Sequence, residues 1–360
     1  MTWDGANSFE GSAEQRGMID LRSDSLTEPT ARMREAAAAA ETGHDGYGGD
    51  PTVRELESVI VERTGMDAAI YLPSGTMANL VAVLTHTEPG DEVVLEAESH
   101  LYTMEVAGIA RIGNVLARPI DGGERGVITA EQVREAYSGS DITHLFDRTP
   151  TGLLALENTH NARGGTAISP ADIEAPSAAA RELGVPVHLD GARLFRAAAA
   201  HGCDIGAYTR VVDSVYIDFA KIGAPFGVGL AGDAAFIESA RRYRQLLGGH
   251  MKQAGIVAAP ALVALDESDR LGDDAEKAAR LAAELSSVDS LSVPSPETNI
   301  LYVDVSETGL TALAFVDACE QRGVLTEAFG DGVVRFVTHR DVSLAEVSDA
   351  ADSIAAVATA

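Results

Sequence analysis

From Ala69 onward, short apolar runs rich in β-branched residues alternate with longer, alanine-rich stretches of helical character. Alternation of this kind is typical of parallel strands joined by crossover helices. It predicts an α/β fold with a doubly wound, mainly parallel sheet. The strand candidates are residues 68–73, 92–97, 114–120, 151–158, 185–190, 213–219 and 227–232. Helices are expected between them at 77–87, 130–138 and 171–184.

The remainder of the chain predicts an extension, an arm and a second domain. Residues 1–17 are polar and without periodicity, which indicates a flexible extension, followed by an N-terminal arm over 18–50. The large domain is expected over 51–265. A nearly continuous helical pattern from Arg241 to Leu285 contains the expected boundary. Beyond it, apolar runs at 299–305 and 333–339 flank a helix candidate at 310–323, which predicts a smaller C-terminal α+β domain over 266–360.

The balance of charge excludes some classes of partner. The 360 residues include 27 basic and 55 acidic side chains, giving a net charge of −28. Because binding to a phosphate backbone requires clustered Lys and Arg, nucleic acid is not expected as a partner. No apolar run reaches the roughly 20 residues of a membrane span, and the N-terminus lacks the regions of a signal peptide. We therefore expect no membrane association and a cytoplasmic location.

Lysine is scarce, with only Lys221, Lys252 and Lys277 among the 27 basic residues. Acid-rich, lysine-poor surfaces stay hydrated where salt screens their self-repulsion, so the composition favours a salt-adapted, halophilic protein. An ordinary acidic protein from a GC-rich genome is the alternative. The two cysteines, Cys203 and Cys319, form no Cys-x-x-Cys motif, so neither a disulfide framework nor a thiolate metal site is expected.

Two strand candidates end at, or are followed by, a residue whose side chain could take part in a reaction. Asp190 closes the run VPVHLD, at the sheet edge where open α/β folds bind ligands. An aspartate here could also serve simply as a helix N-cap. Lys221 follows the next run in apolar surroundings, which lower the pKa of an amine and make it nucleophilic toward carbonyls. A surface lysine in a turn is the alternative.

A turn of small residues and several histidines add weaker signals. Ser74, Gly75 and Thr76 stand between a strand and a helix, where backbone N–H groups can bind a phosphate, although Ser-Gly-Thr also occurs as a plain N-cap. Neither a G-x-G-x-x-G motif nor a P-loop is present, so NAD and ATP sites are not supported. His100, His144 and His160 are each more typical of structural histidines than of catalysts when considered alone.

The combination is more specific than its parts. A phosphate-binding turn, a strand-end aspartate and a lysine 31 residues later (221 − 190) are the groups that pyridoxal 5'-phosphate needs. The chain resembles the low-specificity L-threonine aldolases of the fold-type I pyridoxal phosphate enzymes from about Met18 to the C-terminus. Related aromatic amino acid lyases share several of the motifs. The matching stretches are IDLRSDSLTEPT, GYGGDPTVRELE, LPSGTMAN, EAESHLY, LENTHN, HLDGARLF, AKIGAPFG, GGHMKQAG and VRFVTH.

The resemblance implies a role for each cofactor residue. Lys221 would attach the cofactor covalently, and Asp190 would keep its pyridine nitrogen protonated. Gly75 and Thr76 would bind the phosphate, and His100 would stack on the ring. The large domain is thus expected to be the cofactor-binding domain.

The resemblance also implies a substrate site. Ser23, Arg193 and Arg335 correspond to residues near the substrate carboxylate, where a guanidinium can pair with two oxygens. Arg193 also belongs to the expected cofactor set. His100 or His144 would lie near the β-hydroxyl, because the base there needs a pKa near the working pH.

The implied assembly is a homodimer or homotetramer with active sites at subunit interfaces, so that Tyr47 and Lys252 would serve the neighbouring site. Some positions depart from the family pattern. Ala220 stands where serine is common, Lys252 where arginine is usual, and Gly49 where aspartate is usual. The stretch after Lys221 is one residue shorter than usual. These departures bear on substrate preference.

The reaction implied is retro-aldol cleavage of L-threonine or L-allo-threonine, β-hydroxy-α-amino acids, to glycine and an aldehyde. A different fold-type I activity is the alternative: a β-eliminating lyase, a hydroxyaspartate-type aldolase or an amino acid racemase. A binding protein that keeps a pyridoxal pocket is a third reading, which the intact lysine and aspartate argue against. The spacing of acidic and histidine residues specifies no metal ligand set.

Overall fold

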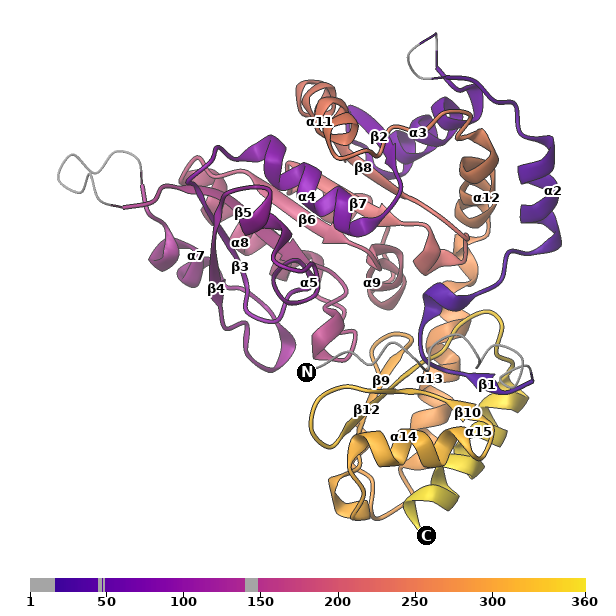
Figure 1. The fold of residues 1–360 in the computed structure, drawn as a ribbon. Coiled ribbons are helices and arrows are strands. Elements are labelled where there is room, and N and C mark those ends of the chain that lie inside the picture. Colours follow the sequence, from indigo (N-terminus) through magenta and orange to yellow (C-terminus); the bar gives the residue numbers. More distant parts are fainter. Residues whose placement is uncertain (1–16, 45–46, 48, 140–147) are drawn as a thin grey trace. The chain divides into compact units, whose positions relative to one another are not determined.

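The computed structural model describes residues 17–44, 47, 49–139 and 148–360 (Figure 1). The chain divides into two compact units. The larger is Thr27–Gly272, and the smaller combines the described residues up to Leu26 with Asp273–Ala360. None of the helices in these described ranges is long and apolar enough to cross a membrane.

A mostly parallel sheet forms the centre of the larger unit. Among its described residues, seven strands pair in the order β2-β8-β7-β6-β5-β3-β4. In this sheet β8 runs antiparallel to both of its neighbours, whereas the other described strands share one direction. The strands are β2 (Ala68–Leu72), β3 (Glu92–Glu96), β4 (Leu116–Ile120), β5 (Thr151–Glu157), β6 (Val187–Gly191), β7 (Ser214–Asp218) and β8 (Val228–Gly232).

The sheet is buried on both faces. Successive side chains of a strand point to opposite sides, and both sets are covered. In β2, Ala69 and Tyr71 pack into one apolar cluster, while Ile70 and Leu72 pack into another. Strands buried on both faces read as continuous apolar runs, which is the signal found in the sequence. The prediction of an α/β fold with a doubly wound, mainly parallel sheet is confirmed.

Helices cover the two faces of the sheet (Figure 1). The α-helices of the larger unit are α2 (Ala31–Ala39), α3 (Pro51–Thr64), α4 (Gly75–His86), α5 (His100–Thr103), α6 (Gly108–Arg111), α7 (Ala130–Ala136), α8 (Pro170–Glu182), α9 (Leu194–His201), α10 (Gly206–Thr209), α11 (Ala234–Leu246) and α12 (Gly255–Asp266). Short 3-10 helices lie at η3 (Gly123–Arg125), η4 (Asn161–Arg163), η5 (Ala220–Ile222) and η6 (Ser268–Arg270). The residues 241–285, read as nearly continuous helix, contain the end of α11, then α12 and α13 (Leu271–Leu285).

The smaller unit is an α+β fold with its own core. β11-β12-β9 form an antiparallel sheet, and β1 pairs in parallel with β10. Leu301, Phe315 and Phe336 are buried in its apolar cluster. Its elements are β1 (Ile19–Asp20), η1 (Asp24–Leu26), β9 (Ile300–Asp304), η7 (Ser306–Thr308), α14 (Ala312–Glu320), β10 (Val324–Leu325), β11 (Glu327–Ala328), β12 (Val333–Val337) and α15 (Leu344–Ala358).

The compact units differ from the boundaries drawn on the sequence. Residues 19–20, assigned there to the N-terminal arm, pair through β1 with β10 and so belong to the smaller unit. The division falls between Gly272 and Asp273 rather than at 265/266. The reason is that α13 continues the helical pattern across the division without a break that the sequence would reveal.

Candidate active site

The predicted cofactor residues lie at one edge of the sheet. Since β2, β3, β6 and β7 share a direction, their carboxyl ends meet at this edge. Gly75 follows β2, His100 follows β3, Asp190 lies near the end of β6 and Lys221 follows β7 in η5. The structure therefore brings four of the predicted residues to the same edge.

Asp190 is a buried acceptor whose hydrogen bonds hold it in place. Its side chain belongs to the fully buried strand β6, and the residue is 4% exposed. Oδ2 accepts a hydrogen bond from Asn79 Nδ2 at 2.9 Å, and Oδ1 accepts one from the Ala192 backbone N–H at 3.1 Å. Burial, together with the charge of Asp190, raises the pKa of Tyr216 well above its ordinary value. The neighbouring phenol thus stays protonated.

The turn before α4 is built for close approach. Ser74 caps the helix, its Oγ accepting from the Met77 backbone N–H at 3.3 Å. A Cβ on Gly75 would lie 2.9 Å from Tyr216 Oη, so a larger residue would clash there. Thr76 is exposed at the first turn of the helix. Backbone donors at a helix N-terminus with an exposed hydroxyl beside them form a suitable site for a phosphate.

The chain around Lys221 is anchored by two contacts. The Ala220 backbone N–H donates to Asp218 Oδ1 at 2.8 Å, and the buried Arg196 donates from Nη2 to the Lys221 carbonyl at 3.1 Å. These bonds hold the backbone on either side of the lysine while its side chain stays partly exposed. Arg193, buried beside the end of β6, donates from Nη1 to Asn161 Oδ1 at 3.2 Å.

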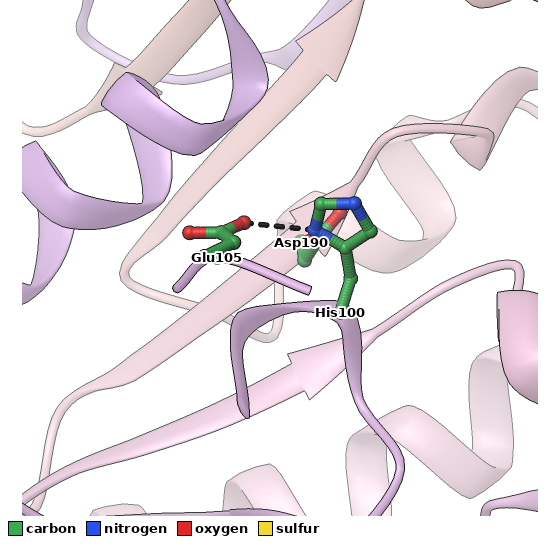
Figure 2. A group of neighbouring side chains, drawn as sticks. All are labelled: His100, Glu105 and Asp190. Atoms are coloured by element: carbon green, nitrogen blue, oxygen red, sulfur yellow. Dashed lines mark hydrogen bonds and ion pairs between the residues drawn. The ribbon is translucent and has the colours of Figure 1, made fainter. Parts of the chain in front are cut away.

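His100 is paired with a carboxylate that sequence analysis did not identify. Figure 2 shows His100, Glu105 and Asp190 together, with His100 Nδ1 2.9 Å from Glu105 Oε1. Glu105 is 4% exposed, and its Oε1 also accepts from Asn79 Nδ2 at 2.7 Å. The backbone N–H of His100 donates to Glu157 Oε2 at 2.6 Å, which fixes the start of α5.

Burial and charge compete at this pair. Burial lowers the pKa of His100, but its hydrogen bond to Glu105 and the charges of Asp190 and Glu157 outweigh burial, so the pKa lies above its usual value. Burial raises the pKa of Glu105, opposed by its hydrogen bonds to His100 and Asn79. The potential ligand atoms of His100, Glu105 and Asp190 lie within 4.8 Å of one another, close enough in principle for a metal ion. The expectation that no metal is bound stays a prediction.

A chain of hydrogen bonds sets the orientation of Asn79. Its Oδ1 is 3.1 Å from His188 Nε2, and His188 Nδ1 is 2.8 Å from Ser214 Oγ, which lies 2.8 Å from His86 Nε2. Burial lowers the pKa of His188 to about 3 and that of His86 to about 4, so both rings are neutral. An amide oxygen can only accept, so His188 donates from Nε2 and accepts at Nδ1. Asn79 therefore presents its amino group to the two carboxylates.

The other predicted residues come from other segments of the chain. Tyr47 and Lys252 are exposed in the larger unit, Tyr47 at 87%. Ser23 and Arg335 belong to the smaller unit, where Arg335 pairs with Glu327 and donates to the Arg22 carbonyl at 3.2 Å. His144 lies outside the described residues. His160, weighed as a weak candidate, is fully buried and pairs through Nε2 with Glu96 at 2.8 Å, which is a structural role.

Comparison with known proteins identifies the family. A family model described as beta-eliminating lyase matches residues 20–308. The chain belongs to the beta-eliminating lyase family. This family member is 39% identical over 336 residues to the low specificity L-threonine aldolase of Escherichia coli (strain K12), which covers 93% of this chain and 97% of the relative. It is 36% identical over 335 residues to low-specificity L-threonine aldolase 1 of Arabidopsis thaliana, covering 91% and 93%.

The fold is also shared with a solved structure in this group. The threonine aldolase of Leishmania major superposes with a TM-score of 0.78 at 20% identity, covering 94% of this chain and 99% of that one. The resemblance inferred from the sequence motifs is confirmed at the level of the family. Asn79, Glu105 and Tyr216 were missed because none forms a motif with a recognised catalytic spacing, although Asn79 stands within the matched stretch LPSGTMAN.

Proposed function

We propose that this protein is a pyridoxal phosphate-dependent aldolase that cleaves L-threonine and L-allo-threonine to glycine and acetaldehyde. The observation that carries the proposal is the placement of Asp190 and Lys221 at the carboxyl ends of adjacent parallel strands, in a chain whose relatives are named threonine aldolases. A β-eliminating lyase, a hydroxyaspartate-type aldolase and an amino acid racemase are the alternatives.

The residues present fit the cofactor. Asp190 offers a buried anionic acceptor for a protonated ring nitrogen, and the turn at Gly75 and Thr76 offers backbone donors and a hydroxyl to a phosphate. Lys221 supplies the amine for covalent attachment. When bound, pyridoxal phosphate supplies an electron-withdrawing ring that accepts the electron pair released at the α-carbon of the amino acid.

The protein's own groups would then bind and deprotonate the substrate. Arg193, Arg335 and Ser23 are proposed to bind the carboxylate, as their positions in the family pattern suggest. Cleavage of the Cα–Cβ bond requires a base to accept the β-hydroxyl proton, and a histidine suits this task near neutral pH. We assign it to His100, with His144 as the alternative.

The assembly and setting are part of the same proposal. Tyr47 and Lys252 are exposed, as expected of residues that complete the site of a neighbouring subunit in a homodimer or homotetramer. The large domain is proposed to hold the cofactor and the smaller one to carry Arg335. The net charge of −28 supports a location in a cytoplasm of high ionic strength.

An absorption spectrum tests the function most directly. The purified protein, supplied with pyridoxal phosphate in high salt, should show a visible band that changes on addition of glycine or L-threonine, with acetaldehyde released from L-threonine and L-allo-threonine. Lys221→Ala should abolish both the band and the release of acetaldehyde, because the attaching amine is lost. Lys277→Arg is the matched control: Lys277 pairs with Asp274 in the smaller unit, and arginine preserves that charge.

Two results would contradict the proposal. A band that shifts with amino acids without release of aldehyde would retain the cofactor but favour a lyase or a racemase, which pyruvate assay and chiral analysis of alanine distinguish. If the wild-type protein and Lys277→Arg are both folded and neither acquires a band with pyridoxal phosphate, the assignment of Lys221 and Asp190 is overturned.

A further inference from the structure

Glu105 is a buried carboxylate that the proposed cofactor does not account for. It is 4% exposed and lies just after the short helix α5. Burying a carboxylate is costly unless hydrogen bonds compensate. Here the compensating partners are His100 Nδ1 at 2.9 Å and Asn79 Nδ2 at 2.7 Å, both at the same oxygen.

The chain of hydrogen bonds through His188 decides which atoms carry protons. Asn79 Oδ1 accepts from His188, so both N–H groups of its Nδ2 point to carboxylates, one to Glu105 and one to Asp190. The imidazole is a stronger base than the carboxylate, so the proton between His100 and Glu105 rests on Nδ1. In neutral His100, Nε2 is then the unprotonated ring atom. Figure 2 shows Nδ1 turned toward Glu105.

We propose that Glu105 is a positioning residue that holds His100 with Nδ1 protonated and leaves Nε2 to accept the proton of the substrate β-hydroxyl. Asn79 supports it by fixing the Glu105 carboxylate and, through the same amide, Asp190. That this proton comes from the β-hydroxyl of the substrate rests on the proposed function. The tautomer of His100 does not.

Three acidic groups act on the His100 ring from different elements. Glu105 contacts it directly, Asp190 faces it from β6, and Glu157 lies at the end of β5. Replacing Glu105 by glutamine removes the negative charge that favours the charged ring and leaves only a neutral amide oxygen as acceptor. The pKa of His100 should therefore fall, and the acidic limb of the pH profile of kcat/KM should move to lower pH.

The test compares Glu105→Gln with a matched pair in the same unit. Glu96→Gln alters a second buried carboxylate that pairs with a histidine, His160, but that makes no hydrogen bond to His100, Asn79 or Asp190. For Glu105→Gln we expect kcat for threonine cleavage to fall about tenfold or more, with the acidic limb displaced. For Glu96→Gln the limb should stay in place. In the background of His100→Asn, adding Glu105→Gln should change kcat little, since there is no ring left to orient.

A measurement independent of catalysis uses protein labelled with ¹⁵N in histidine, with and without pyridoxal phosphate. The His100 signals, assigned by their loss in His100→Asn, should report the tautomer with Nδ1 protonated. In Glu105→Gln the titration of His100 should shift to lower pH and the preference between the two tautomers should weaken. If the protein releases no aldehyde, this readout still decides the role of Glu105.

Three results would overturn the inference. One is an unchanged His100 titration and pH profile in Glu105→Gln. Another is an equal loss of kcat from Glu105→Gln with and without His100, which would indicate a structural role only. The third is loss of activity and a changed His100 spectrum on EDTA treatment of wild type, reversed by a divalent cation, which would make the three residues a metal site.

Discussion

Two buried carboxylates, Asp190 and Glu105, lie close together without contacting each other through their oxygens. Burial and the like charge of Asp190 together raise the pKa of Glu105. Asn79 prevents direct opposition by donating one N–H to each, and His188 holds that amide in the required orientation. A single neutral side chain thus makes both charges tolerable.

Asn79→Asp should therefore be strongly destabilising, because it replaces two donors with a third carboxylate of the same shape. Hydrogen bonds to charged groups contribute about 1.5–3 kcal/mol each, so we expect a loss of about 3 kcal/mol or more in the free energy of unfolding at pH 8, measured by urea denaturation. The new carboxyl would be stable only when protonated, so the loss should shrink as the pH falls. An equal loss at pH 5 and pH 8 would contradict this explanation.

At the scale of elements, the pair of Glu96 and His160 ties the end of β3 to the segment after β5. Burial alone would raise the pKa of Glu96, but its bonds from His160 and from the backbone N–H groups of Glu98 and Gly122 lower it to about 2. A carboxyl with a lowered pKa stabilises the folded state above its unfolded value of 4.5, and that contribution is lost as the pH falls from 4.5 to about 2.

Glu96→Gln should accordingly flatten the acid dependence of stability. A shift from 4.5 to about 2 corresponds to a contribution of about 3 kcal/mol near neutral pH. The variant should be less stable than wild type at pH 6 by up to that amount, and the difference should close between pH 4.5 and about 2. Thermal unfolding across this range measures it. Parallel curves for the two proteins would refute the role of the pair.

The elements were predictable where a local signal exists. The strands of the large sheet are continuous apolar runs, so seven candidates matched β2 to β8 within about two residues at each end. Asp190 and Lys221 could be found because each follows such a strand. Glu105 and Asn79 could not, since their partners lie as far as 111 positions away in the sequence. The two residues of β1 carry no pattern at all, which is why the arm was drawn apart from the smaller unit.

At the scale of the whole molecule, 55 acidic side chains against 27 basic ones produce a net charge of −28, which opposes the compact state. Salt shortens the range of this repulsion to about 8 Å near 0.15 M and about 3 Å at 1 M. The chain is therefore expected to be more stable in concentrated salt.

The melting temperature should rise as NaCl increases from 0.05 M to 2 M. Salt screens the repulsion between charges mainly in the lower part of this concentration range, whereas the effect of salt on apolar burial continues at higher concentrations. Scanning calorimetry of the cofactor-loaded protein would measure both. Neutralising six exposed acidic residues should reduce the rise in melting temperature at low NaCl concentration. A melting temperature that is constant or falls as NaCl increases would contradict the prediction.

The pairing of β1 with β10 determines the order in which the protein can be completed during translation. Ile19 pairs with Val324, 305 residues later (324 − 19), so the first strand leaves the ribosome long before its partner exists. All of Thr27–Gly272 emerges in the interval and can fold. The smaller unit closes only when the last quarter of the chain has been synthesised, which makes it the final part of the molecule to form.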